Sequence, residues 1–187
     1  MSTTLLLRRL KEVGRKKTNI VPCFFTLLNA YFGFLGILAA TQEAYGLAAV
    51  CILLAACMDV VDGYSARILG ATTLLGKELD SLSDAISFCL LPSILFYCWR
   101  GTWHPLVSAT VSFVYLAAGL VRLARFNSTE QSTSSTFCGL PTPAAALICS
   151  ILIVLNVPTV YGIYVVGTGM LVVAVLMVSS FRFPSLK

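Results

Sequence analysis

Residues 51–92 read CILLAACMDVVDGYSARILGATTLLGKELDSLSDAISFCLLP, and this stretch decides the fold. Two apolar runs flank a short polar segment, and each run carries two aspartates at the end that faces the other run. An aspartate at membrane depth costs a few kcal/mol, so it normally faces a polar cavity or a partner. Asp59 and Asp62 are spaced i,i+3 and Asp80 and Asp84 i,i+4, which places each pair on one face of a helix. The stretch therefore predicts two neighbouring helices that bring four carboxylates together.

The chain on either side of this stretch is equally apolar. Hydrophobic residues make up 58% of the 187 residues and charged residues only 11%, and the mean hydropathy is +0.89. A soluble domain carries about a quarter charged residues. We therefore predict an all-α integral membrane protein with six transmembrane helices, each of about 20 residues. The predicted spans are 20–41, 44–69, 79–98, 105–126, 140–157 and 159–181.

The N-terminus forms a separate basic segment in this prediction. It holds no apolar run followed by a small-residue cleavage site, so we expect no removed signal peptide. Its leucines alternate with Lys and Arg, which indicates either a basic amphipathic helix in the membrane interface or a disordered tail that only sets topology. Basic residues gathered at one end suit an anionic membrane surface and not nucleic acid. The predicted organisation is residues 1–18 as this segment and 19–187 as the membrane domain.

The distribution of Lys and Arg predicts the orientation of the chain. With six spans, 12 of the 13 basic residues fall on the side that holds both termini, and only Arg100 falls on the other side. Cytoplasmic loops are the ones enriched in Lys and Arg. We therefore expect both termini and the four aspartates on the cytoplasmic side.

Four converging carboxylates repel one another unless protons or cations neutralise them. Hard divalent cations take oxygen ligands, and Mg²⁺ in particular joins a few carboxylates to substrate phosphates. Two such ions can hold both the attacking and the leaving oxygen of a phosphoryl transfer. Between the aspartate pairs, Gly63 and Gly76 let a phosphate approach the backbone, Ala66 leaves space, and Arg67 can pair with it bidentately. The residues therefore predict a metal-dependent site for phosphoryl transfer.

Other interpretations of the aspartates stay open at this point. The carboxylates could cap helices or pair with Arg67 and Lys77, although capping accounts only for Asp80. They could line a proton relay or a cation-coupled transporter, which would place them near the bilayer midplane and repeat them in two halves. They could also belong to a prenyltransferase with DDxxD-like clusters, but the chain contains no second cluster.

The stretch from Asp59 to Asp84 resembles the signature of the CDP-alcohol phosphotransferase family. The family pattern DxxDGxxARx₈GxxxDxxxD is filled at every fixed position. Four further segments, FFTLLNAYFGFLGI, RLARFN, FCGLPTPAAA and SSFRFPSLK, are similar to those of phosphatidylserine synthases within that family. The resemblance extends over residues 20–187. One departure is Pro22-Cys23, where relatives often carry Pro-Asn.

The resemblance implies an activity, cofactors and partners. CDP-diacylglycerol, or an archaeal ether-lipid counterpart, would donate a phosphatidyl group to the hydroxyl of L-serine, and CMP would leave. Other acceptors, such as glycerol phosphate or inositol phosphate, remain an alternative, and so does a cation-coupled transporter. The implied cofactor is Mg²⁺ or Mn²⁺, with two ions. The implied assembly is a homodimer in the cytoplasmic membrane of a prokaryote.

The resemblance also implies which residues form the site. The metal ligands would be Asp59, Asp62, Asp80 and Asp84, and Asp84 would also be the general base that takes the serine hydroxyl proton. The CDP site would consist of Thr26, Asn29, Asp59, Gly63, Ala66, Arg67 and Gly76. The candidates for binding the serine carboxylate or a donor phosphate are Arg122, Arg125 and Asn127. The alternative for the two arginines is that they only anchor a helix end on the cytoplasmic side.

Overall fold

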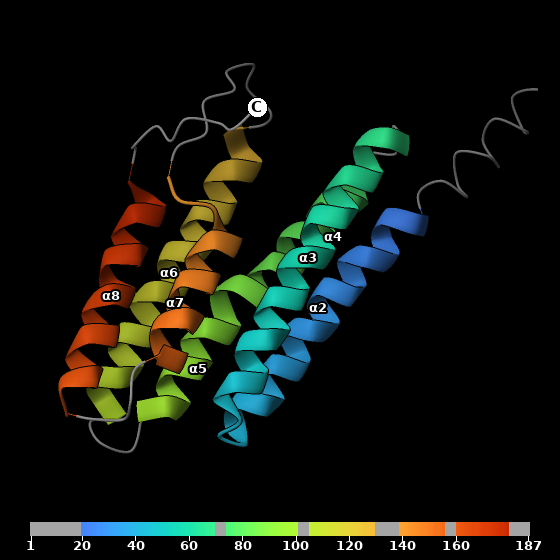
Figure 1. The fold of residues 1–187 in the computed structure, drawn as a ribbon. Coiled ribbons are helices and arrows are strands. Elements are labelled where there is room, and N and C mark those ends of the chain that lie inside the picture. Colours follow the sequence, from blue (N-terminus) through green and yellow to red (C-terminus); the bar gives the residue numbers. More distant parts are fainter. Residues whose placement is uncertain (1–19, 70–73, 101–104, 130–138, 156–159, 180–187) are drawn as a thin grey trace, which may run out of the picture.

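The computed structural model describes residues 20–69, 74–100, 105–129, 139–155 and 160–179, and the regular structure of these residues is helical (Figure 1). The predicted N-terminal segment 1–18 lies outside the described residues. The helices, in chain order, are α2 (Ile20–Thr41), α3 (Tyr45–Leu69), α4 (Leu74–Asp84), the π-helical η1 (Ala85–Leu90), α5 (Leu91–Arg100), α6 (Pro105–Thr129), α7 (Thr142–Leu155) and α8 (Val160–Val178).

All six segments predicted to span the membrane are helical, and five of them are long and apolar enough to cross it. The exception is α7, which has 14 residues and is therefore only about 21 Å long, against about 30 Å for a hydrocarbon core. The chain is an integral membrane protein with five candidate spans: Cys23–Thr41, Tyr45–Ser65, Leu74–Trp99, Pro105–Ser128 and Tyr161–Val178.

The helices form two groups, which are joined by one long, interrupted helix and by the contact of α7 with α3 (Figure 1). α2 and α3 lie side by side as an antiparallel pair, joined by a tight turn in which Glu43 adopts a left-handed φ of 61°. α6, α7 and α8 form the second group, in which α8 packs against both α6 and α7. The consecutive segments α4, η1 and α5 cross from the first group to the second. This crossing places α4 next to α2, and η1 between α2 and α6.

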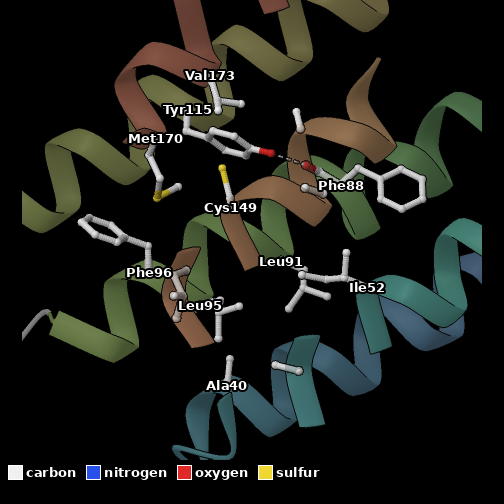
Figure 2. Close-up of a cluster of buried hydrophobic side chains, with 14 of the residues drawn as sticks. Ala40, Ile52, Phe88, Leu91, Leu95, Phe96, Tyr115, Cys149, Met170 and Val173 are labelled. Atoms are coloured by element: carbon white, nitrogen blue, oxygen red, sulfur yellow. Dashed lines mark hydrogen bonds between the residues drawn. The ribbon is translucent and has the colours of Figure 1, made fainter. Parts of the chain in front are cut away.

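The hydrophobic core lies where η1 and α5 meet the other helices (Figure 2). Phe88, Leu91 and Leu95 are fully buried there, together with Ile52 of α3 and Tyr115 of α6. The remaining apolar side chains on the outer faces are exposed, as expected for helices whose solvent is lipid. The core therefore fixes the segment that directly follows the aspartates of α4.

Two glycines allow neighbouring helices to approach η1 closely. A Cβ built on Gly33 of α2 would overlap Oγ of Ser87, and one built on Gly119 of α6 would lie 2.5 Å from Sγ of Cys89. Small residues at helix interfaces let transmembrane backbones come together in this way. The helix that carries the aspartates is thus held tightly from both sides.

α4 begins at Leu74, earlier than the predicted start of that span at residue 79. Asp80 therefore lies well inside the helix, and the interpretation of Asp80 as a helix cap is wrong, because a cap residue precedes the first turn. The apolar pattern gave no sign of this start, since α4 itself is polar in composition. The helix also changes to π-helical geometry directly after Asp84, where the pattern predicts an uninterrupted helix.

Candidate metal and nucleotide site

Three of the predicted carboxylates converge between α3 and α4. The ligand oxygens of Asp59, Asp62 and Asp80 all lie within 4.8 Å of one another, with Asp62 buried and the other two half-buried. Like charges this close repel strongly unless protons or a cation neutralise them. A set of three carboxylates offers oxygen ligands only, which is the chemistry that Mg²⁺ and Mn²⁺ select. The residues present therefore fit a divalent cation of this kind.

Asp84 lies outside this group of three but next to it. The residue is buried, and its Oδ1 accepts a 3.1 Å hydrogen bond from Nδ2 of Asn29. It is close enough for the charges of Asp59, Asp80 and Asp62 to act on it. The structure thus brings all four predicted aspartates to one site and fixes one oxygen of Asp84 through α2.

α2 supplies the polar partners of this site. Oγ1 of Thr26 donates a 2.7 Å hydrogen bond to Oδ2 of Asp62, and Asn29, one turn further along, donates to Asp84. Both side chains are buried. The Oδ1 atom of Asn29 is also buried and has no hydrogen-bond partner among the described residues. The two residues predicted to contact the nucleotide are therefore bonded to the aspartates that follow them in the chain.

The bond from Thr26 gives a first testable prediction. Thr26→Val removes the hydroxyl at nearly constant volume, so Asp62 loses a donor that orients it. Residues that hydrogen-bond to metal ligands typically contribute about 10–100-fold to metal affinity. We therefore expect the Mn²⁺ dissociation constant to rise by that factor. Electron paramagnetic resonance of free Mn²⁺ measures this directly. Thr110→Val is the matched control, because Thr110 is exposed on α6 and its hydroxyl bonds only within its own helix. An equal Mn²⁺ affinity in the two variants would contradict the prediction.

The four other residues of the signature, Gly63, Ala66, Arg67 and Gly76, follow between the two aspartate pairs in the chain, on α3 and α4. Gly63 directly follows Asp62, and a Cβ built on it meets no atom of the described residues within 4 Å. Gly76 lies half-buried in the first turn of α4. Ala66 and Arg67 belong to α3, but their side chains lie outside the described part of the chain. Open space at Gly63 is where a phosphate group can approach the backbone of α3.

The two arginines at the end of α6 have different surroundings. Arg122 is half-buried, its Nη1 donates to Oγ1 of Thr142 at 3.4 Å, and its Nε is buried with no hydrogen-bond partner among the described residues. Arg122 is also close enough to Asp84 for their charges to interact. Arg125 is exposed, and its Nη1 donates a 3.0 Å hydrogen bond to the carbonyl of Val178 at the end of α8. Arg122 is therefore bonded to α7 and lies within range of the charge of Asp84, whereas Arg125 is bonded to the end of α8.

The third candidate on α6, Asn127, is bonded to the helix that carries Asp80. Its Nδ2 lies 2.9 Å from Oγ of Ser81, and that hydroxyl lies 3.1 Å from Oδ1 of Asn127. The pair ties α6 to α4 one residue beyond Asp80. The sequence patterns did not predict the contacts of Ser81 with α6 and of Ser87 with α2. The one signal in the sequence is that both are polar residues on a span that carries aspartates.

Comparison with known proteins gives a consistent result. Residues 19–180 match the CDP-alcohol phosphatidyltransferase family. A CDP-diacylglycerol–serine O-phosphatidyltransferase of Helicobacter pylori is 32% identical over 178 residues, covering 90% of this chain and 73% of the relative. The protein of the same name from Bacillus subtilis is 33% identical over 169 residues, covering 90% of this chain and 92% of the relative. An archaetidylserine synthase of Methanothermobacter thermautotrophicus is 34% identical over 183 residues, covering 88% and 69%.

Proposed function

Because this chain belongs to the CDP-alcohol phosphatidyltransferase family, we propose that it transfers a phosphatidyl group from CDP-diacylglycerol to the hydroxyl of L-serine and releases CMP. The observation that carries the proposal is the group of three carboxylates within 4.8 Å of one another, with Asp84 beside it. The names of the bacterial relatives support serine as the acceptor. The archaeal relative supports an ether-lipid donor as the alternative to diacylglycerol.

The chemistry follows from the position of Asp84. The serine hydroxyl oxygen forms a bond to the phosphorus that carries the diacylglycerol, and the bond from that phosphorus to the oxygen of CMP breaks. Asp84 takes the hydroxyl proton, and CMP leaves with the electron pair. Asn29 holds Oδ1 of Asp84, which leaves Oδ2 as the proton acceptor. A base held in place in this way contributes about 10²–10⁴-fold to the rate.

Three of the aspartates could hold the cation that the reaction needs. Asp59, Asp62 and Asp80 would hold Mg²⁺ or Mn²⁺, which would neutralise the pyrophosphate and the charge that develops on CMP. We propose a second ion shared by Asp84. Thr26 and Asn29 lie at the nucleotide end of this site, with Gly63, Ala66, Arg67 and Gly76 along the phosphates. A membrane location lets the acyl chains stay in lipid while the headgroup enters the polar site.

Arg122 is the residue we propose for the serine carboxylate, because its buried Nε has no hydrogen-bond partner among the described residues and its charge interacts with that of Asp84. Arg125 is bonded to the end of α8 and serves as an anchor for that helix. Asn127 contributes by holding α4 through Ser81. A phosphorylated acceptor would need more Arg or Lys side chains near the site than serine does. Glycerol phosphate and inositol phosphate are therefore less suitable acceptors.

Replacement by lysine distinguishes the proposed roles of Arg122 and Arg125. Arg122→Lys keeps the charge but removes the planar fork, so we expect the KM for serine to rise about tenfold, the effect of one charge-assisted hydrogen bond. Arg125→Lys is the matched variant and is expected to leave that KM within about twofold. Initial rates of CMP release at varied serine concentrations measure both. A rise in KM for Arg125→Lys, with none for Arg122→Lys, would reverse the assignment.

For the chain as a whole, we propose a basic segment at 1–18 that lies in the membrane interface and a membrane domain at 19–187. α7 completes six crossings in this proposal, supported by its buried face against α3 and α8. Six crossings place both termini and the site on the cytoplasmic side, where 12 of the 13 basic residues then lie. The location is the cytoplasmic membrane of a prokaryote, and the assembly is a homodimer.

The test of the function is CMP release by the purified protein in detergent. CDP-diacylglycerol is supplied with Mn²⁺ or Mg²⁺ and, separately, L-serine, glycerol 3-phosphate or inositol phosphate. Metal-dependent release with serine supports the proposal. Release with another acceptor alone would keep the chemistry and overturn the acceptor. The absence of release with any acceptor would favour a cation-coupled transporter, although the carboxylates lie in one half of the chain and not in two repeated halves.

A further inference from the structure

The helix that carries Asp84 is interrupted directly after it. η1 is π-helical from Ala85 to Leu90, and the N–H of Leu91 bonds to the carbonyl of Ile86, five residues back. Such segments are rare and occur mostly as single turns within α-helices, frequently at functional sites. Pro92 supplies the physical cause, because it has no N–H and its ring conflicts with the carbonyl four residues before it. That carbonyl belongs to Phe88, in the middle of η1.

Tyr115 of α6 provides the donor that Pro92 lacks. Its hydroxyl donates a 3.1 Å hydrogen bond to the carbonyl of Phe88, as Figure 2 shows by the dashed line. The tyrosine is fully buried, and its hydroxyl, which also contacts the side chain of Cys149, has no exposure to water. A buried carbonyl without a donor is costly. The hydroxyl of Tyr115 therefore stabilises the interrupted geometry of η1.

η1 is bonded at the preceding residue as well, Ser87, to a different helix. Oγ of Ser87 donates a 2.9 Å hydrogen bond to the carbonyl of Asn29 on α2, and the side chain of the same Asn29 holds Asp84. Two consecutive residues, Ser87 and Phe88, are thus bonded to helices on opposite sides. Because they lie within one turn of Asp84, their position determines where the Asp84 carboxylate lies.

We propose that Tyr115 is a positioning residue for Asp84: through the carbonyl of Phe88, its hydroxyl holds η1 in the place that sets Asp84 beside the other three aspartates. Tyr115 acts through the backbone and does not touch the reacting groups. The inference deepens the proposed function, because it depends on the role of Asp84 there. It also predicts that the need for the hydroxyl arises from Pro92.

A double-mutant cycle tests this dependence. Tyr115→Phe removes only the hydroxyl, and Pro92→Ala restores a backbone N–H that can bond to the Phe88 carbonyl. Two quantities are measured for the four proteins: the Mn²⁺ dissociation constant by electron paramagnetic resonance, and kcat and KM for CMP release with serine. In the wild-type background, we expect Tyr115→Phe to weaken Mn²⁺ binding and lower kcat, each about tenfold, the low end for a residue that supports a metal site. The KM for serine should stay within about twofold.

In the Pro92→Ala background, the same removal of the hydroxyl is expected to change the Mn²⁺ dissociation constant by about twofold or less. A merely structural tyrosine would lower the folded fraction but leave the Mn²⁺ affinity of the folded protein unchanged, and that result would overturn the proposal. Equal fold-changes in both backgrounds would overturn it as well. Tyr164→Phe, at an exposed tyrosine of α8, is the control and should change neither quantity.

The test still gives a result if a variant does not fold or if the wild-type protein is inactive with serine. If Pro92→Ala does not fold, Pro92→Leu restores the same N–H with a larger side chain and replaces it in the cycle. If the wild-type protein releases no CMP with serine, the proposed function fails, while the Mn²⁺ dissociation constants of the four proteins still decide the role of Tyr115.

Discussion

Replacing Asp84 by asparagine is expected to lower the rate of CMP release about 10²–10⁴-fold, the contribution of a general base. The amide oxygen introduced by Asp84→Asn can still accept the hydrogen bond from Asn29, so the helix packing is retained. The amide cannot take a proton from serine, and it is a poorer ligand for a cation. The measurement is the initial rate of CMP release with saturating CDP-diacylglycerol, serine and Mn²⁺.

Glu78→Gln is the matched control for this variant. Glu78 is an exposed carboxylate on the same helix, so its neutralisation changes the charge of α4 by the same amount without touching the site. We expect CMP release by this variant within about twofold of the wild type. A rate for Asp84→Asn within about tenfold of the wild type would exclude Asp84 as the base and leave it, at most, a role in holding a cation.

The largest effect on stability is expected for Gly33→Val. A Cβ at Gly33 would overlap Oγ of Ser87 and lie only 3.0 Å from its Cα, which is backbone and cannot rotate away. Overpacking of this kind typically costs about 1–3 kcal/mol. Relief of the overlap would also push Ser87 from the carbonyl of Asn29 and so disturb Asp84. We therefore expect a lower midpoint of thermal unfolding together with a lower rate of CMP release.

Gly46→Val is the control, because it makes the same change from glycine to valine within a helix but without the close contact to η1. Gly46 is an exposed residue of α3, and a Cβ built on it meets no atom of the described residues within 4 Å. The same substitution there should leave both the unfolding midpoint and the rate unchanged. Circular dichroism of the detergent-solubilised proteins measures the unfolding. An equal shift in the midpoint for the two variants would contradict the close contact between α2 and η1.

The convergence of the aspartates could be predicted from the sequence because helix periodicity fixes it. Spacings of three and four residues place Asp59 with Asp62, and Asp80 with Asp84, whatever the rest of the fold does. The ends of the apolar runs then predict that the two helices meet there. The structure confirms that the oxygens of three of the four aspartates gather within 4.8 Å.

The partners of these aspartates could not be predicted in the same way. The bond from Thr26 to Asp62 joins residues 36 positions apart, and the bond from Asn29 to Asp84 joins residues 55 apart. Periodicity within a helix carries no information about such contacts between helices. The π-helical turn could not be predicted for the same reason. Pro92 predicts a disturbance of the helix, but the hydroxyl that bonds to the Phe88 carbonyl comes from Tyr115 on another helix.

The two hydrogen bonds from α2 have a consequence for how the protein is made. Chains are synthesised from the N-terminus onward, so α2 is made before α3 and α4. Thr26 and Asn29 are therefore already part of the chain when Asp62 and Asp84 are added to it. Each aspartate-bearing helix then finds a hydrogen-bond donor for its carboxylate on α2, and a carboxylate at membrane depth is costly without a partner. α2 therefore supplies a hydrogen-bond donor to each of the two aspartate-bearing helices that follow it among the described residues.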